Sequence, residues 1–259
     1  MNLVVGVEYD GSSYCGWQRQ NTGPSVQETL EAALSAIADE PVKVTAAGRT
    51  DTGVHACGQV VHFRCTKKRP LCAWVRGSNT VLPDSIVVLW STIVGEDFHA
   101  RFSAIARRYC YVILNRAVRP TYLAKRVAWD YRPLDVPRMV AAAPGLIGRH
   151  DFSAYRAASC QAKTSVRELR RLDVERRGDW VLIHVEADAF LHHMVRNLAG
   201  VLIAIGAREQ HPDWAYQVLQ SRDRTQAGVT APPEGLYLMS VTYPDKFDLP
   251  CPTLTSPFW

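Results

Sequence analysis

Two successive halves of this chain present the same order of strand-like and helix-like segments, and this order restricts the possible fold more than any other feature of the sequence. In the first half the segments follow one another at residues 3–9, 25–37, 42–46, 59–65, 71–81 and 86–94. In the second half they follow one another at residues 107–114, 136–147, 168–175, 180–187, 192–205 and 236–243. Each half therefore has the order β-α-β-β-α-β, which is typical of a split βαβ unit with an antiparallel sheet. We expect an α+β fold of two related halves joined around a central active-site cleft.

The length of the chain agrees with this division. Its 259 residues are enough for two domains of ordinary size, and a hydrophobic share of 47% is normal for a globular protein. We place an N-terminal half at 1–105, a C-terminal half at 106–246 and an irregular tail at 247–259. The halves share no recognisable sequence identity, so the repeat is one of pattern only.

Several classes of protein are disfavoured by composition. No apolar run reaches the roughly 18 residues that cross a bilayer, and the first residues carry no basic segment typical of a signal peptide. We therefore expect a cytoplasmic protein with no membrane partner. Seven scattered cysteines without a CxxC pair argue against a disulfide framework and a zinc ribbon. His55, Cys57 and His62 lie close together, but no second ligand pair follows, so we expect no metal site.

Positive charge is concentrated in two places, although the formal net charge is only +5. The first cluster comprises Arg101, Arg107, Arg108, Arg116, Arg119, Lys125 and Arg126, with Tyr109, Tyr111, Tyr122 and Trp129 among them. The second comprises Arg167, Arg170, Arg171, Arg176 and Arg177. Such clusters are often only a solvated face. The interleaved aromatic residues favour a phosphate-rich partner instead.

The segment Gly48–Ala56 carries the densest chemical signal. Two glycines bracket a loop in which Arg49 stands two residues before Asp51, so a ligand can approach the backbone closely. From the residues alone, a β-turn whose aspartate caps a local N–H remains an alternative. A phosphate-binding P-loop is excluded because the Lys-Ser/Thr pair is missing, and a zinc deaminase because its His-x-Glu and Pro-Cys-x-x-Cys motifs are missing.

Gly48–Ala56 resembles the signature of the tRNA pseudouridine synthase I family, the TruA-type enzymes. Four further stretches agree in the same order: Tyr9-Asp10-Gly11 with Gly16-Trp17-Gln18, Phe102-Ser103-Ala104 with Arg107-Arg108-Tyr109-Cys110-Tyr111, His192-His193-Met194-Val195-Arg196-Asn197, and Glu234-Gly235-Leu236-Tyr237-Leu238. The resemblance thus covers nearly the whole chain. Thr52 and Cys57 depart from the residues usual in the family, but both are small.

The resemblance implies a role for five residues. Asp51 would be the catalytic carboxylate, Arg196 its partner, and Arg49 the residue that helps to extrude the target uridine or holds its phosphate. Tyr109 would stack on the uracil, and Leu236 would pack on its other side. Without the resemblance, a structural ion pair explains Arg196 equally well. Core packing likewise explains Tyr109 and Leu236. We take His192 and His193 as helix-start or packing residues and not as acid–base groups.

The implied reaction requires few participants. The bond between C1′ and N1 of uridine is broken, the uracil rotates, and C1′ is joined to C5, with no redox change and no added group. No cofactor is therefore expected, and Asp51 must be ionised whether it attacks C1′, attacks C6 or removes a proton from C2′. The family implies uridines 38, 39 and 40 of the tRNA anticodon arm as targets, and a homodimer. A silent RNA-binding module and a carboxylate-based hydrolase are the alternatives, although no second acid accompanies Asp51 in its loop.

Overall fold

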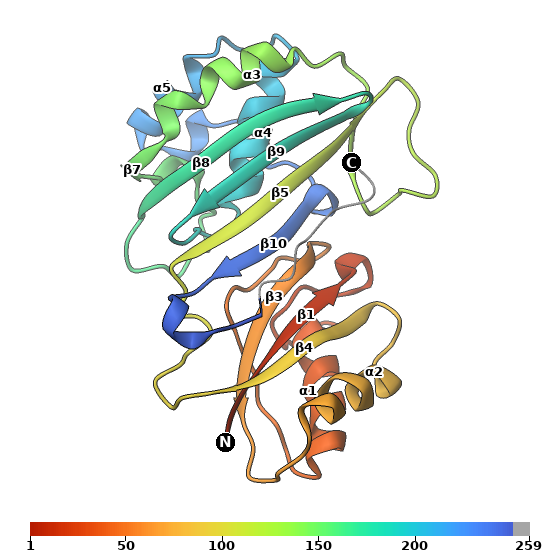
Figure 1. Ribbon diagram of the computed structural model, residues 1–259. Helices are drawn as coiled ribbons and strands as arrows, with labels where there is room; N and C mark the ends of the chain where they lie inside the picture. The colour runs from red at the N-terminus through yellow and green to blue at the C-terminus, as the bar shows by residue number, and fades with distance from the viewer. Residues whose placement is uncertain (251–259) are drawn as a thin grey trace. The chain divides into compact units, whose positions relative to one another are not determined.

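The computed structural model describes residues 1–250, and these divide into two compact units. The first unit consists of Met1–Ile105 together with residues 238–250, and the second of Ala106–Tyr237. Both units are α+β, with mixed but largely antiparallel strands, which confirms the predicted fold class (Figure 1). The expected pairing of two related split halves remains a prediction. Most of the tail expected at 247–259 lies outside the described residues.

The first unit has four long strands and two main helices. In chain order its elements are β1 (Asn2–Tyr9), η1 (Gly11–Ser13), α1 (Val26–Ala38), β2 (Thr45–Ala46), β3 (His55–Arg64), the π-helix η2 (Ala73–Gly77), α2 (Ser78–Val81), β4 (Ile86–Val94), β10 (Leu236–Thr242, from Leu238 onward) and η7 (Asp245–Phe247). The strand order is β4-β1-β3-β10, with β2 added to β3. Val5 of β1 pairs with Val61 of β3 and with Ser91 of β4, both antiparallel, so β1 lies at the centre of the three.

Helix α1 forms where the sequence predicts it. Ser25 is its N-cap and accepts a hydrogen bond from the Glu28 N–H at 3.3 Å, as the capping pattern indicates. The apolar stripe Val26, Leu30 and Leu34 is fully buried, because residues three to four apart share one face of a helix. A second cluster of buried side chains packs on the sheet and consists of Val4, Ala47, Val60, Phe98, Ala100 and Tyr243. Loop 95–105 is thereby tied to the sheet.

The second unit combines a five-stranded sheet with three main helices. Its elements are β5 (Ala106–Asn115), β6 (Ala128–Asp130), α3 (Val136–Ala142), η3 (Pro144–Leu146), β7 (Gly148–Asp151), η4 (Ser153–Tyr155), β8 (Val166–Arg177), β9 (Trp180–Ala187), α4 (Met194–Gly206), α5 (Trp214–Ser221), η5 (Arg224–Gln226) and η6 (Pro233–Gly235). The strand order is β5-β9-β8-β7, with β6 beside β5. Figure 1 shows α3 and α4 on the same side of β8 and β9.

Strand β6 corrects the expectation of purely antiparallel pairing. It runs parallel to β5, with Ile113 beside Ala128. The buried Asn115 side chain holds this arrangement, because its Nδ2 donates to the carbonyl oxygens of Asp130, at 2.9 Å, and Arg132, at 2.6 Å. The chain leaving β5 therefore returns alongside the same strand. The sequence does not predict this pairing, because β6 has only three residues and no alternation of apolar and polar side chains.

The division of the chain also differs from the expected one near its end. Residues 238–246, assigned from the sequence to the C-terminal half, group with the first unit. The physical reason is strand pairing, since β10 is hydrogen-bonded to β3, and the Ile105 N–H donates to the Thr242 carbonyl at 2.9 Å. Throughout residues 1–250, no helix is both long and apolar enough to cross a membrane.

Candidate functional site

The loop that carries Asp51 lies between β2 and β3 of the first unit and is fastened at its base. Gln59, which is fully buried on β3, donates from Nε2 to the Gly48 carbonyl at 2.7 Å and accepts from the Gly48 N–H at 3.4 Å. A buried amide that satisfies a loop backbone in this way fixes where the loop leaves the sheet. Arg49 is exposed on this loop, whereas Asp51 is half-buried.

Thr50, directly before Asp51, is held by both its side chain and its backbone. Its Oγ1 shares a 2.7 Å hydrogen bond with the hydroxyl of Tyr9 at the end of β1, and the group is buried. Its carbonyl accepts from the Trp17 N–H at 3.0 Å, and Trp17 is 2% exposed. The neighbouring Asp51 carbonyl accepts from the Val54 N–H at 3.1 Å, which closes the turn. The backbone on both sides of the carboxylate is therefore positioned before any substrate arrives.

Two glycines outside the loop allow other segments to approach it. Gly16 has φ of +88°, and a Cβ there would lie 2.8 Å from the Thr50 carbonyl oxygen. A Cβ on Gly11 would lie 2.0 Å from the Val54 carbonyl oxygen, which no side chain can accept. The motifs Tyr9-Asp10-Gly11 and Gly16-Trp17-Gln18 thus pack directly against the backbone of the Asp51 loop. The sequence alone assigns no role to these motifs, although glycines beside aromatic residues are the signal that indicates one.

His55, Cys57 and His62, which lie close together in the sequence, have other surroundings in the structure. Nδ1 of the buried His55 accepts from the Gly11 N–H at 3.1 Å, and Nδ1 of His62 accepts from the Ala100 N–H at 3.1 Å. Burial, assisted by nearby Glu8, raises the pKa of the Cys57 thiol to about 12, so this thiol is protonated at neutral pH. These contacts make His55 a positioning residue for the turn at Gly11.

Tyr109, Arg196 and Leu236 all belong to the second unit. Tyr109 is 8% exposed on β5, and the edge of its ring meets Phe190 at a centroid distance of 5.1 Å. Tyr111, two residues along, shares the same face of the strand and donates from its hydroxyl to the Pro232 carbonyl at 2.8 Å. This face of β5 is therefore tied to the segment 231–236.

Arg196 is tied to the same segment. It lies half-buried in the first turn of α4, its Nε donates to the Ala231 carbonyl at 2.9 Å, and its own carbonyl accepts from the Ala231 N–H at 3.1 Å. Leu236 begins β10 with 6% exposure, and a Cβ on Gly235 would lie 2.9 Å from Cζ of Tyr111. Segment 231–236 thus connects the first turn of α4 to the tyrosine face of β5 within one unit.

The two histidines before α4 occupy the helix start, as expected. His193 is the N-cap residue, in the left-handed region with φ of +62°, and its side chain makes no capping hydrogen bond. The rings of His192 and His193 lie 4.0 Å apart, and His192 Nδ1 lies 3.3 Å from the Ser159 hydroxyl oxygen. A non-glycine residue in this conformation is uncommon and marks a sharply defined entry into the helix that carries Arg196.

A half-buried carboxylate on a preorganised loop, within a basic protein, is what a carboxylate enzyme acting on nucleic acid requires. The model of the family described as tRNA pseudouridine synthase matches residues 6–103 and 142–244, and this chain belongs to that family. The protein is accordingly an isomerase that acts on uridine in tRNA, and it binds RNA as its substrate.

Relatives named tRNA pseudouridine synthase A are similar over almost their entire length. The relative from Hydrogenovibrio crunogenus is 52% identical over 99% of this chain and 98% of its own. The Nitrosococcus oceani relative is 56% identical over 96% of each, and a Coxiella burnetii relative is 55% identical over 96% of this chain and 95% of its own. A solved structure described as a Cbf5-Nop10-Gar1 complex covers 78% of this chain and 45% of its own at 14% identity, with a TM-score of 0.37, too distant a likeness to support any argument.

Proposed function

We propose that Asp51 is the catalytic carboxylate of this tRNA-uridine isomerase and that its targets are uridines 38, 39 and 40 of the anticodon arm. The observation that carries the proposal is the fastening of its loop: Thr50 is bound by Tyr9 and Trp17, and Gly48 by Gln59, while Asp51 itself stays half-buried. A loop fixed through buried contacts on both sides of one carboxylate suits a group that must reach a single atom of its substrate.

The reaction needs a charged carboxylate and an extruded base. The N1–C1′ bond breaks, the uracil turns, the C5–C1′ bond forms, C5 loses its proton to solvent, and N1 gains one. Asp51 serves this sequence as an anion, by attack at C1′, attack at C6, or removal of the C2′ proton. Because the target uridine is stacked in RNA, it must first leave the stack, at a cost of a few kcal/mol. Exposed Arg49, two residues from Asp51, is proposed to assist that step or to hold the phosphate.

Three residues of the second unit complete the proposal. In this proposal Tyr109 supplies a ring for the uracil, Leu236 packs on the base, and Arg196 is the partner of the catalytic carboxylate. Their common attachment to segment 231–236 supports a joint role, since a shift of that segment would displace Arg196 and Leu236 together. Removal of the Tyr109 ring should cost about 1–3 kcal/mol of stacking. We further propose a cytoplasmic homodimer, which light scattering of the purified protein would test.

The decisive experiment uses unmodified tRNA transcript that carries tritium at uracil C5. The wild-type protein should release tritium to water while the base stays attached to the RNA, and Asp51→Asn should bind tRNA but release none. Asp39→Asn is the matched control, because Asp39 is exposed in the left-handed region, which asparagine tolerates. Tritium release by Asp51→Asn at an appreciable rate would refute the role of Asp51, and free uracil would indicate hydrolysis. Release confined to positions outside 38–40 would refute the proposed targets.

A further inference from the structure

Three aromatic rings of the first unit form a short column that ends in solvent. His62 of β3 lies against His99 with ring centroids 4.7 Å apart, and His99 stacks on Phe102 at 4.3 Å with an interplanar angle of 24°. His62 is half-buried at one end of this column. Phe102 is 76% exposed at the other end. A large apolar ring is thus presented to water against the stacked ring of His99, which in turn contacts the ring of His62 at an interplanar angle of 57°.

The column is held by hydrogen bonds from its own loop. His99 Nδ1 accepts from the N–H groups of Arg101 and Phe102 at 3.1 and 3.2 Å, and the His99 N–H donates to Ser103 Oγ at 3.0 Å. His62 Nδ1 accepts from the Ala100 N–H at 3.1 Å, so the loop is also bound to the sheet. A ring that is already ordered in this way loses little further freedom when a ligand stacks on it. The two hydrogen bonds to His99 Nδ1 order the segment that presents the exposed ring.

Cationic side chains accompany the exposed ring. The Arg101 guanidinium carbon lies 5.7 Å from the centroid of the Phe102 ring. Arg64, on the same strand as His62, pairs with Glu96 at 2.8 Å, and both side chains are at least 70% exposed. Glu96 offsets the charge of Arg64, whereas Arg101 is the cation that lies against the Phe102 ring. The surroundings of Phe102 therefore suit an aromatic ligand that carries negative charge.

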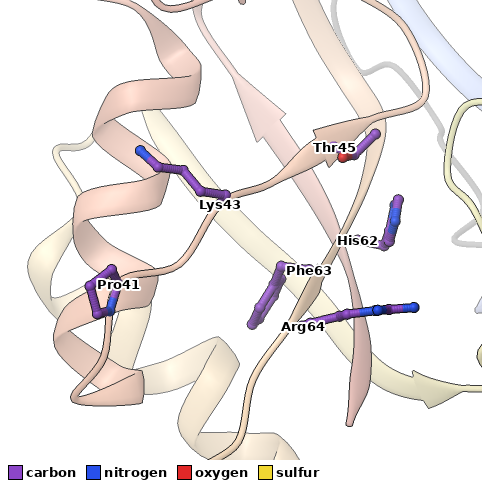
Figure 2. A pocket seen from close by; sticks show the side chains of 6 residues that line it. All are labelled: Pro41, Lys43, Thr45, His62, Phe63 and Arg64. Atoms are coloured by element: carbon purple, nitrogen blue, oxygen red, sulfur yellow. The ribbon is translucent and has the colours of Figure 1, made fainter.

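An open cavity of about 320 Å³ adjoins the buried end of the column. It is lined by Pro41, Lys43, Thr45, His62, Phe63 and Arg64, and Figure 2 shows His62 and Arg64 on one side of β3 with Phe63 on the other. Burial, and then the neighbouring His99, lower the pKa of His62 to about 4. The imidazole is consequently neutral at neutral pH, while Lys43 and Arg64 beside it are each paired with a carboxylate, of Glu31 and Glu96 respectively.

We propose that Phe102, supported by His99, is a docking platform for an unpaired base of tRNA other than the uridine that reacts, with Arg101 binding an adjoining phosphate. Stacking of nucleobases on aromatic side chains is tolerant of sequence, because every base presents a π-face. Cations beside the ring neutralise the backbone without reading its sequence. This proposal rests on the action of the protein on tRNA and is independent of the role proposed for Asp51.

The first test measures tRNA binding and turnover with variants at position 102. Phe102→Ala should weaken binding of full-length tRNA, and raise KM, by roughly 5- to 150-fold while kcat stays near that of the wild type. Phe102→Tyr preserves the ring and should bind as the wild type does. Tyr216→Ala, at an exposed ring on α5, is the matched control and should leave binding unchanged. Unchanged binding by Phe102→Ala would overturn the proposal, as would a fall in kcat together with a lower Tm, which indicates packing.

A second test identifies what touches the ring. A photoreactive benzoyl-phenylalanine introduced at position 102 should crosslink to tRNA when the complex is irradiated. Crosslinking to a second copy of the protein instead would assign this surface to protein association and overturn the proposal. Both tests read binding, so they keep their meaning if Asp51→Asn retains activity. A failure of the platform and a failure of the catalytic proposal are therefore distinguishable.

Discussion

Strand β8 and the loop 116–127, both in the second unit, have similar shares of arginine and lysine but differ in how those charges are used. On β8, three arginines each pair with a carboxylate two residues away: Arg170 with Glu168, Arg171 with Asp173, and Arg177 with Glu175. Residues two apart in a strand lie on the same face, so alternation itself creates these pairs. The positive charge of β8 is thereby largely offset within the strand.

The loop 116–127 has no comparable carboxylates. Arg116 donates from Nε to the Val118 carbonyl of its own loop at 2.9 Å, and neither Arg116 nor Arg119 forms an ion pair within residues 1–250. Exposed apolar and aromatic groups stand beside them, with Val118 70% and Tyr122 78% exposed. Unpaired cations next to exposed rings are the combination that binds the backbone and bases of RNA.

The comparison teaches that a count of arginines overstates the surface available to RNA. A paired arginine produces a local dipole, whose field falls off faster than that of a single charge and is further screened by salt. Both clusters favoured a phosphate-rich partner when judged from composition. Ion pairing distinguishes the arginines of β8 from Arg116 and Arg119, which are the better candidates for contact with tRNA.

The largest effect is expected on the free energy of unfolding, at the residue that joins the loop 116–127 to β8. Asn115 is 8% exposed, and its Oδ1 accepts from Leu134 N–H at 3.1 Å and from Nη2 of Arg176 at 2.7 Å, while Nδ2 holds β6. Asn115→Ala should therefore lower the free energy of unfolding by about 2–4 kcal/mol, because buried backbone groups lose their partners. Urea unfolding followed by circular dichroism measures this. Asn115→Asp should also destabilise the protein, because a carboxylate oxygen in place of Nδ2 cannot donate to the carbonyl oxygens of Asp130 and Arg132. A neutral effect of the alanine variant would show that the loop and β8 are held by other contacts.

A smaller effect is expected on tRNA affinity. Arg119→Ala should weaken binding several-fold and reduce the slope of log K against log salt by about 1, the result of losing one phosphate contact. Filter binding at several salt concentrations measures the slope. Because Arg119 is exposed, the melting temperature should stay the same. An unaltered slope would remove Arg119 from the interface and weaken the contrast with β8.

Strong local patterns allowed most of the fold to be predicted. Strands β4 and β9 begin and end at the predicted residues, and α1 follows its capping signal. Strand β3 begins at His55, four residues before the predicted start, because pairing with β1 extends it across Ala56 despite a weak strand pattern. Tertiary contacts of this kind have no signature in a single segment.

The candidate site was only partly predictable from the sequence. The loop of Asp51 stood out through its glycines and charged residues, whereas the contacts that fasten it did not. Gln59 and Thr50 look like ordinary polar residues in the sequence, and their role follows only from burial against Gly48 and Tyr9. The same holds for β6, which depends on the side chain of Asn115.

A paired arginine of β8 should matter less than Arg119. Arg171→Ala is expected to change tRNA affinity less than about twofold and the free energy of unfolding by less than about 1 kcal/mol, since an exposed pair contributes little. The matched comparison is Arg119→Ala under identical salt conditions. If Arg171→Ala weakened tRNA binding as much as Arg119→Ala, the pair with Asp173 would open on binding, and the distinction between the two regions would fail.

The smallest expected effect concerns the acid side of the stability profile. Hydrogen bonding from His184, at 2.9 Å, and then from Arg177 lowers the pKa of Glu175 below its ordinary value of 4.5. A carboxyl group with a lowered pKa in the folded state stabilises the protein above pH 4.5, and this contribution is lost as the pH falls from there through the folded-state pKa. Glu175→Gln should therefore be slightly less stable at pH 6 and should lose less stability than the wild type between pH 5 and pH 3. Urea midpoints across that range provide the measurement. Parallel profiles for the two proteins would mean that the ion pair of Glu175 contributes nothing measurable to folding. Offsetting the positive charge of β8 would then be its only consequence.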